Sequence, residues 1–173
     1  PGGNLATIQE KNGRWTLEQQ AWWTLPNKAM ESPLPLDAVG EVRDLLERSI
    51  TNQLNADRPL GCLLSGGLDS SLLTAWACKI RGEPIKTFSV GYADPRFDER
   101  LPAKRLANYL HCPHYSVQLT SDKFFYQLDQ AVLRGDTLLA DQAIVPLSLL
   151  YETVTQEVQV VLDGDGADDL WLA

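Results

Sequence analysis

Apolar side chains recur every three or four residues after Pro35, with charged residues between them. The positions are Leu36, Val39, Val42, Leu45, Leu46, Ile50 and Leu54. This spacing places them on one side of a helix and predicts an amphipathic helix of about five turns. The polar segment from Asn55 to Pro59 ends that pattern.

Short apolar runs alternate with helical patterns along the rest of the chain. The runs expected as strands are 60–64, 85–90, 114–119 and 158–162. The segments expected as helices are 72–82, 98–110, 121–133 and 143–155. We expect Gly91 to stop the second strand and Ser121 with Asp122 to cap the third of these helices. The alternation predicts an α/β fold, a parallel sheet with helices on both faces and ligands beyond the carboxyl ends of its strands.

Residues 1–25 follow a different pattern, which predicts a β-hairpin. Apolar residues of 5–8 and 15–17 flank the turn dipeptide Asn12-Gly13. A proline-rich linker from Pro26 to Pro35 comes next. We therefore expect a connector over residues 1–25, which looks like the tail of another domain, and a separate domain over residues 26–173.

Composition narrows the class of protein. Apolar residues make up 44% of the chain and charged residues 22%, which is typical of a globular protein. The net charge of −8 and the pI near 4.7 argue against a nucleic-acid partner. No apolar stretch approaches the roughly 20 residues that cross a bilayer, so no membrane partner is expected. The odd set Cys62, Cys78 and Cys112 predicts reduced, mostly buried thiols and a cytoplasmic location.

The string from Ser65 to Ser71, Ser-Gly-Gly-Leu-Asp-Ser-Ser, lies between an expected strand and an expected helix. Backbone amides and the positive end of a helix can bind an anion there. Asp69 would repel a bare phosphate, but it fits if Mg²⁺ lies between them. The alternative is a tight turn with a serine cap and no ligand. No Gly-Lys-Ser/Thr follows the glycines, so this loop does not indicate transfer of a terminal phosphate.

A second polar string, Asp163 to Asp169, follows the last expected strand. Its four aspartates would repel one another without a cation or hydrogen-bond donors. A solvated acidic loop is one alternative. A calcium-binding loop fails because Asp168 stands where that loop needs glycine. A dinucleotide fingerprint fails because Gly164 and Gly166 lack a third glycine.

The first string resembles the pyrophosphate-binding loop of the N-type ATP pyrophosphatases, or PP-loop proteins. The flanking segments, Gly61 to Leu64 and Phe88 to Gly91, are similar to glutamine-dependent asparagine synthetases. The resemblance implies an adenine nucleotide alpha hydrolase-like, Rossmann-like fold. It also implies that ATP is split into AMP and pyrophosphate while a carboxylate becomes an acyl-adenylate. Under that resemblance the cofactors are ATP and Mg²⁺.

The resemblance also implies roles for single residues. Pyrophosphate and its Mg²⁺ would be held by Ser65, Gly66, Gly67, Asp69 and Ser70. Leu64 and Val90 would contact the adenosine through backbone groups.

The second string resembles the family signature Ser-Gly-Glu-Gly-Ala/Ser-Asp-Glu. Gly164, Gly166, Ala167 and Asp168 match it, whereas Asp163, Asp165 and Asp169 replace Ser, Glu and Glu. The resemblance implies that Asp163 and Gly164 lie at the nucleotide and that Asp168 is a metal ligand. Asp165 is the candidate for helping to form the adenylate, with a side chain one methylene shorter than Glu.

Two further segments resemble parts of the family. Phe97-Asp98-Glu99 is similar to its Tyr/Phe-Asp-Glu step into a helix. Asp136, Asp141 and Pro146 match a segment that shapes the acceptor pocket, but Thr137-Leu138 stands where the family has Glu-Pro. Aspartate is therefore one candidate acceptor and another carboxylate is the other.

The resemblance leads us to expect a part of a larger enzyme. The family's glutaminase domain, which supplies ammonia from glutamine, is expected upstream, and residues 1–25 would be its last hairpin. Neither its N-terminal cysteine nor the later catalytic lysine has a counterpart here, so we expect a C-terminally truncated domain. The nitrogen donor and an oligomer are left open. The alternatives are a related cyclase that forms a β-lactam or a lasso peptide, and an inactive nucleotide-binding fragment.

Overall fold

A computed structural model describes residues 2–24, 36–135 and 141–167. The chain divides into two compact units, Pro1–Ala38 and Val39–Ala173. Each unit is described by itself below.

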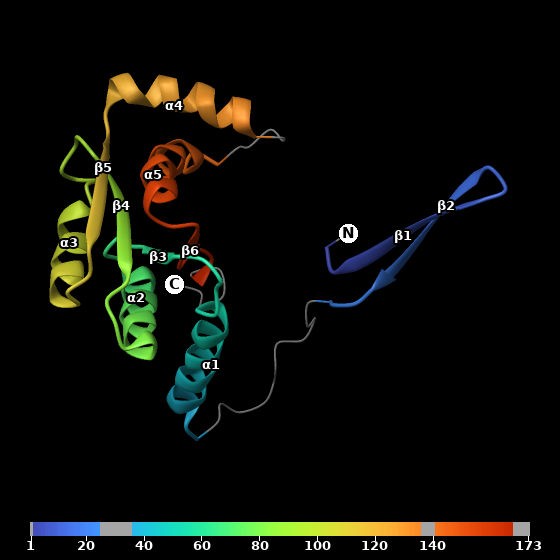
Figure 1. Ribbon diagram of the computed structural model, residues 1–173, viewed down its shortest axis with the longest axis horizontal. Helices are drawn as coiled ribbons and strands as arrows, with labels where there is room; N and C mark the ends of the chain where they lie inside the picture. Colours follow the sequence, from blue (N-terminus) through green and yellow to red (C-terminus); the bar gives the residue numbers. More distant parts are fainter. Residues whose placement is uncertain (1, 25–35, 136–140, 168–173) are drawn as a thin grey trace. The chain divides into compact units, whose positions relative to one another are not determined.

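The first unit is an antiparallel hairpin of β1 (Asn4–Lys11) and β2 (Arg14–Ala21) (Figure 1). Asn12 and Gly13 connect the strands with φ values of 55° and 74°, which confirms the predicted Asn-Gly turn. The pairs Ile8–Leu17 and Glu10–Trp15 share one face, because side chains alternate along a strand. That face is mainly apolar and exposed, with 65% of Ile8 and 70% of Trp15 accessible.

The second unit is built on a four-stranded, wholly parallel sheet with the order β5-β4-β3-β6. Its strands are β3 (Leu60–Leu63), β4 (Lys86–Tyr92), β5 (His114–Leu119) and β6 (Val160–Leu162). β3 pairs with β4 on one side and β6 on the other, so the first and last strands of the unit are neighbours. The predicted α/β class with a parallel sheet is confirmed.

Helices cover both faces of this sheet (Figure 1). They are α1 (Ala38–Gln53), α2 (Leu68–Arg81), α3 (Arg100–Tyr109), α4 (Ser121–Arg134) and α5 (Ile144–Glu157). Cys62 of β3 packs with Ile50 of α1 and Ala77 of α2, whereas the adjacent Leu63 packs with Leu150 of α5. Consecutive residues of one strand therefore face opposite helix layers, as the pleat requires.

The remaining helices extend these two layers. α3 packs beside α2 through Ala103 and Ala107, which contact Leu64. α4 lies on α5, where Gln127 Nε2 donates to Glu152 Oε1 at 3.2 Å. A bilayer-spanning helix is not found among the described residues, since every helix falls short in length or apolar character.

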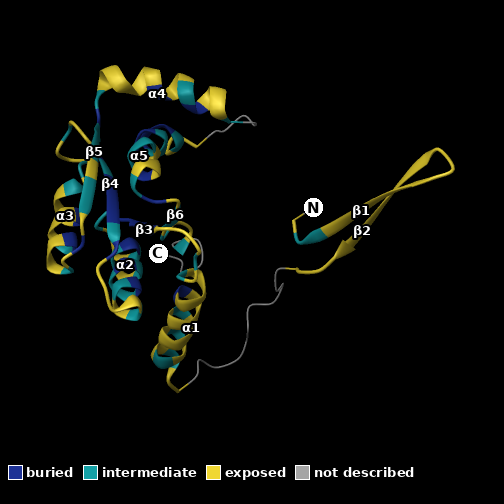
Figure 2. Cartoon of the chain, in the orientation of Figure 1, coloured by how far each residue is buried: buried dark blue, intermediate teal, exposed yellow. Residues whose placement is uncertain are grey.

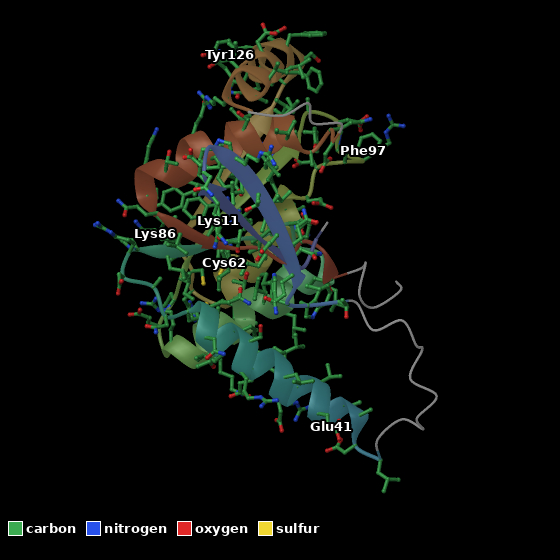
Figure 3. All side chains as sticks on the ribbon, turned by 90° about the vertical axis from the view of Figure 1, so that its right-hand side faces the viewer. Lys11, Glu41, Cys62, Lys86, Phe97 and Tyr126 are labelled. Carbon is green, nitrogen blue, oxygen red and sulfur yellow. The ribbon has the colours of Figure 1, made fainter. Side chains whose placement is uncertain are left out.

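Burial follows the layers. Figure 2 shows the central strands largely buried and α1 and α4 largely exposed. Cys62 lies inside the unit with no accessible surface, while Phe97 and Tyr126 extend from it (Figure 3). The α1 helix forms where the apolar spacing predicts it, but only Ile50 of that helix is fully buried. Cys62 and Cys112 are buried and Cys78 partly so, and all three thiols are free.

Two local expectations were wrong. The strand β4 does not stop at Gly91 but continues to Tyr92, because both residues pair with β5, Gly91 with Gln118 and Tyr92 with Leu119. The glycine is explained by the Asp98–Arg100 pair, which occupies the space where a side chain at position 91 would lie. The helix α4 has Thr120, not Ser121 or Asp122, at its N-cap, and no side chain caps it.

His114 joins β5 to β4 through both ring nitrogens. Its Nδ1 lies 2.9 Å from Thr87 Oγ1 and its Nε2 lies 3.1 Å from Ser89 Oγ. Thr87 Oγ1 already donates to the carbonyl of Pro113 at 3.1 Å, so it accepts from Nδ1–H and the Ser89 hydroxyl donates to Nε2. These bonds fit the neutral ring. Burial, and secondarily the charge of Lys104, lowers the pKa of His114 from its usual 6.5.

The lowered pKa of His114 predicts a pH-dependent stability. The unfolded chain binds a proton near pH 6.5 and the folded chain only at lower pH, so the free energy of unfolding decreases as the pH falls through this window. Urea unfolding at pH 8 and pH 5.5 should show this loss in the natural chain and a smaller loss in His114→Gln.

The ion-paired carboxylates titrate below the pH range in which the natural chain and His114→Gln are compared. The pKa values of Asp98 and Glu157 are lowered from 3.8 and 4.5 by their cationic partners, so the stability they contribute is lost only at lower pH. Equal pH dependence in the two proteins would show that His114 is not the responsible group.

Candidate nucleotide site

The segment 65–71, called the phosphate loop below, follows the carboxyl end of β3 and includes the first turn of α2. Gly66 has a φ of 86°, and a Cβ there would lie 2.8 Å from the backbone nitrogen of Ala103 in α3. A side chain at this position would therefore meet both backbone strain and a steric clash. Glycine lets the loop lie directly against the first turn of α3.

Serine hydroxyls fix the shape of this loop. Ser70 Oγ accepts from the Ser65 backbone amide at 3.2 Å and lies 2.9 Å from Ser65 Oγ. Ser65 Oγ accepts in turn from the Gly67 amide at 3.2 Å. Because Ser70 is nearly fully buried, these bonds hold the turn from within.

The start of α2 has the character of an anion site. Its N-cap is Gly67, and no side chain caps the helix, so the predicted alternative of a serine cap is wrong. The first amides of a helix carry partial positive charge and need acceptors. A phosphate group can supply them.

The second acidic loop meets the phosphate loop at this helix start. It follows β6, which is hydrogen-bonded to β3 in parallel, so both loops leave the same edge of the sheet. A Cβ at Gly164 would lie only 3.1 Å from the backbone nitrogen of Ser70. The two strings singled out in the sequence thus form one site.

A cavity of about 330 Å³ opens where these loops join α1 and α2. Three carboxylates line it, those of Asp69, Asp163 and Asp165. Its walls also include the side chains of Leu46, Ser49, Ile50, Gln53, Leu72, Leu73 and Trp76. The cavity is therefore lined by both acidic and apolar groups.

The charges in this cavity disfavour one another. Partial burial, and then the neighbouring charge of Asp165, raises the pKa of Asp163, although its own loop amides counteract part of this. Burial and the charge of Asp163 raise the pKa of Tyr151 on α5. Asp165 Oδ1 accepts from the Gly166 amide at 3.0 Å. A cation or a donor-bearing ligand would relieve this repulsion.

The donor set fits Mg²⁺ held jointly with a ligand. Within the described ranges, no three His, Cys, Asp or Glu residues are grouped to hold a metal ion by themselves. Mg²⁺ commonly takes one or two carboxylates and completes its shell with water and substrate phosphates. Asp69 at the start of α2 suits that arrangement, whereas Asp168 lies outside the described residues.

Leu64 directly follows β3, and Val90 lies on the neighbouring strand β4. The Leu64 amide donates to the Phe88 carbonyl at 2.7 Å, and its side chain is buried against α3. Only the carbonyl of Leu64 is therefore left for a ligand. Val90 is half-buried in β4 and packs near Val117.

The segment assigned to the acceptor pocket is described in part. Asp141 Oδ1 accepts from the Ala143 amide at 2.9 Å just before α5, and Pro146 is buried within that helix. Asp136 and Thr137-Leu138 lie outside the described residues, as does Asp169.

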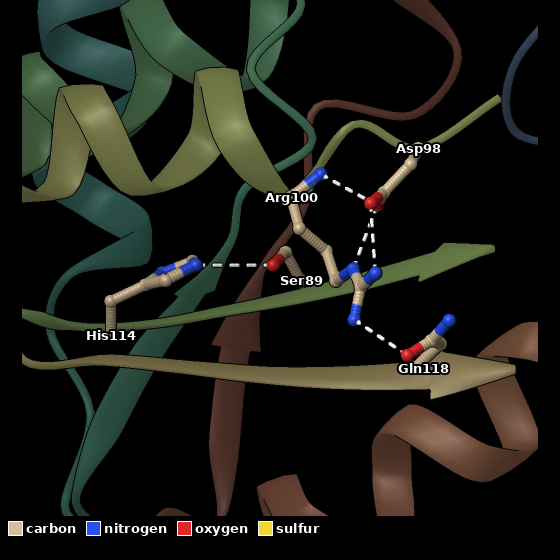
Figure 4. A network of polar contacts seen from close by, with 5 residues as sticks. All are labelled: Ser89, Asp98, Arg100, His114 and Gln118. Atoms are coloured by element: carbon tan, nitrogen blue, oxygen red, sulfur yellow. Dashed lines mark hydrogen bonds and ion pairs between the residues drawn. The ribbon is translucent and has the colours of Figure 1, made fainter. Parts of the chain in front are cut away.

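Sequence reasoning did not find a polar network beside the loop. Asp98, Arg100 and Gln118 are linked across the α3 start and β5 (Figure 4). The available signals were the glycine inside a strand and the repeated Asp-X-Arg spacing at 94–96 and 98–100.

A larger hollow of about 720 Å³ lies at the ends of β4 and β5. Its walls include four aromatic residues, Tyr92, Phe97, Phe124 and Phe125. None of the residues from the two sequence motifs lines it, so the smaller cavity is the candidate site.

The parallel sheet and the glycine-serine loop at its carboxyl edge define an α/β fold of the adenine nucleotide alpha hydrolase type. The NH3-dependent NAD synthetase of Campylobacter jejuni has a similar fold, with a TM-score of 0.52 and 16% identity, over 76% of this chain and 58% of that one. The glutamine-dependent NAD⁺ synthetase of Acinetobacter baumannii, solved with ADP, gives a TM-score of 0.54 and 19% identity, over 84% and 29%.

Sequence comparison is more specific. The profile of the asparagine synthase family matches residues 41–172, and the chain belongs to this family. Asparagine synthetase 1 (glutamine-hydrolysing) of Bacillus subtilis is 35% identical over 77% of this chain and 21% of its own length. The human asparagine synthetase is 31% identical over 75% and 24%. The chain thus spans about a fifth to a quarter of these curated relatives.

Adjacent glycines in the loop provide a matched test of its geometry. Gly66→Ala should lower the free energy of unfolding by about 1–3 kcal/mol, because the new Cβ strains the backbone and strikes the α3 start. Gly67 has a φ of −67° and its nearest neighbour would be the Ser65 hydroxyl at 3.3 Å. Gly67→Ala should therefore change stability by less than about 0.5 kcal/mol in urea unfolding. Equal losses would contradict the close packing of Gly66 on α3.

Proposed function

We propose that this chain is the nucleotide-binding part of an ATP-dependent amidotransferase of the asparagine synthetase type. It would bind ATP with Mg²⁺ and activate a carboxylate as an acyl-adenylate. The single observation that carries the proposal is the contact of Gly164 with the start of α2. That contact brings Asp69, at the start of α2, and the carboxylates of the second loop into one cavity.

In the proposed reaction, a carboxylate oxygen of the acceptor attacks the α-phosphorus of ATP and pyrophosphate leaves. Ammonia then attacks the acyl carbon, and AMP leaves as the amide forms. With aspartate as the acceptor, the intermediate is β-aspartyl-AMP and the product is asparagine. Ammonia derived from glutamine is the proposed nitrogen donor.

The proposed roles follow the position of each group. Ser65, Gly66, Gly67 and Ser70 shape the turn, in which the Ser65 and Gly67 amides donate to serine hydroxyls. The other amides of the turn and those at the uncapped start of α2 would hold the pyrophosphate. Asp69 would hold the Mg²⁺ that offsets phosphate charge, with Asp168 as a second proposed ligand.

The other proposed contacts lie at the adjacent strand ends. Asp163 and Gly164, which line the cavity, would lie beside the nucleotide. The backbone of Leu64 and Val90, which are not among the cavity's lining residues, would contact the adenosine at the adjoining strand ends. Asp165 is the proposed group that helps to form the adenylate.

The hairpin supports a domain proposal. Its exposed apolar face is typical of a strand pair that belongs to a larger sheet, because two strands alone are marginally stable. We assign residues 1–25 to the end of an upstream glutaminase domain and residues 26–173 to part of the synthetase domain. The free cysteines agree with a cytoplasmic protein.

One observation favours a second candidate, a cyclase that activates another carboxylate. Asp163 and Asp165 stand where the resemblance implies Ser and Glu, and they alter both the charge and the reach of the site. A shorter carboxylate would suit an acceptor that is placed differently.

The sign of the Asp69 effect should depend on the metal. Asp69→Asn should weaken Mg-ATP binding about tenfold or more, because a charged metal ligand is lost. Without magnesium, in excess chelator, the same change should leave ATP binding equal or tighter, because a repulsive charge is removed. Calorimetry measures both. Asp122→Asn, which changes the first turn of α4 in the same way, should alter neither. No Mg-ATP binding by the folded natural chain would contradict the proposal for this chain.

Acceptor choice is tested with the full-length protein that contains this chain. Pyrophosphate release should require a carboxylate acceptor and should be fastest with aspartate in a panel that includes larger carboxylates. Asp165→Ala should lower the rate by about a hundredfold or more while Mg-ATP still binds, if this group acts in adenylation. Release with a larger carboxylate but not with aspartate would support the cyclase instead.

A further inference from the structure

The first turn of α3 is held between the phosphate loop and the sheet. On one side, the backbone of Pro102 and Ala103 lies against Gly66 so closely that a Cβ there would come within 2.8 to 3.0 Å. On the other side, Arg100 lies over Gly91 of β4, where a Cβ would be 2.6 Å from its Cγ. The first turn of α3 therefore packs against both the loop and the sheet.

A forked ion pair fixes the turn. Arg100 Nε lies 2.7 Å from Asp98 Oδ1, and Arg100 Nη2 lies 2.8 Å from Oδ2. The Arg100 amide donates to the same carboxylate at 3.2 Å, so Asp98 holds both the side chain and the backbone. Arg100 Nη1 donates to Gln118 Oε1 on β5 at 3.3 Å (Figure 4). About a quarter of each charged side chain is accessible, 27% for Arg100 and 23% for Asp98.

We infer that Asp98 and Arg100 are positioning residues, which hold the phosphate loop in its binding shape through the first turn of α3. They contact neither the loop nor the candidate cavity. Their effect passes from the ion pair to the α3 backbone, and from Ala103 to Gly66. The expected effect on ATP rests on the proposed function, whereas the effect on the loop does not.

The chain contains a matched control four residues earlier. Asp94 and Arg96 form the same Asp-X-Arg fork, with Arg96 Nη2 2.6 Å from Asp94 Oδ2 and the Arg96 amide 3.0 Å from Oδ1. This pair is more exposed, with 79% of the Arg96 side chain accessible, and the Arg96 guanidinium lies over the Phe97 ring instead of reaching a strand. Asp94→Asn thus makes the same chemical change without a link to the loop.

The experiment compares Asp98→Asn with Asp94→Asn by amide hydrogen exchange in the NMR spectrum. Two backbone amides report on the turn and the loop. The Ala103 amide donates a hydrogen bond to the Glu99 carbonyl, and the Gly67 amide donates one to Ser65 Oγ. Both should exchange at least about threefold faster in Asp98→Asn only, because local opening becomes easier. The Val158 amide, bonded to Val154 on the far side of the sheet, should not change. Gln118→Ala, a milder change, should act in the same direction.

Mg-ATP affinity of the same proteins gives the functional outcome. It should fall at least about threefold in Asp98→Asn and stay unchanged in Asp94→Asn, since a disordered loop must be reordered on binding. Equal effects of the two variants would overturn the inference, and so would parallel acceleration of Val158, which indicates general destabilisation. The two proposals can fail separately. Faster loop exchange in Asp98→Asn, together with no Mg-ATP binding by the natural chain, would support the inference and contradict the proposed function.

Discussion

Parallel pairing of β6 with β3 is the constraint on which the site depends. Strands that run in one direction release their loops at the same edge of a sheet, so the segments after Leu63 and Leu162 must emerge side by side. Gly164 completes the approach, because no Cβ separates its backbone from the start of α2. Backbone geometry thus joins the glycine-serine loop and the acidic loop, which are far apart in the sequence.

The same approach concentrates negative charge, and this has an energetic consequence. The raised pKa of Asp163 means that its ionised form is less favourable in the folded chain than in the unfolded one. At neutral pH that charge therefore lowers the free energy of unfolding, by the linkage between proton binding and stability. A cation or a set of donors at the cavity would reverse the effect. A local cost to stability that a ligand can relieve is typical of binding sites.

The sequence was sufficient for the elements whose signal is local. Apolar runs gave the strands, Asn12-Gly13 gave the hairpin turn, and strand–helix alternation gave the parallel sheet. The order of the strands could not be predicted from the sequence, because β3 and β6 are hydrogen-bonded neighbours although they are far apart along the chain. The end of β4 was misplaced because glycine is usually a turn residue. The glycine at position 91 is instead explained by the Asp98–Arg100 pair, which occupies the space that a side chain there would need. Tertiary contact overrides propensity at such positions.

The candidate site shows the same division between local and distant information. The serine and glycine pattern of the loop was legible because each residue serves a nearby backbone group, as Ser70 does for Ser65. The packing behind the loop could not be predicted from the sequence. Gly66 packs against the first turn of α3, and that turn carries an ion pair that is hydrogen-bonded to β5. A motif thus names the atoms that meet a ligand, while the stiffness of that motif is set by residues outside it. Under the proposed function, two chains with the same loop sequence would therefore differ in ATP affinity when the first turn of α3 differs.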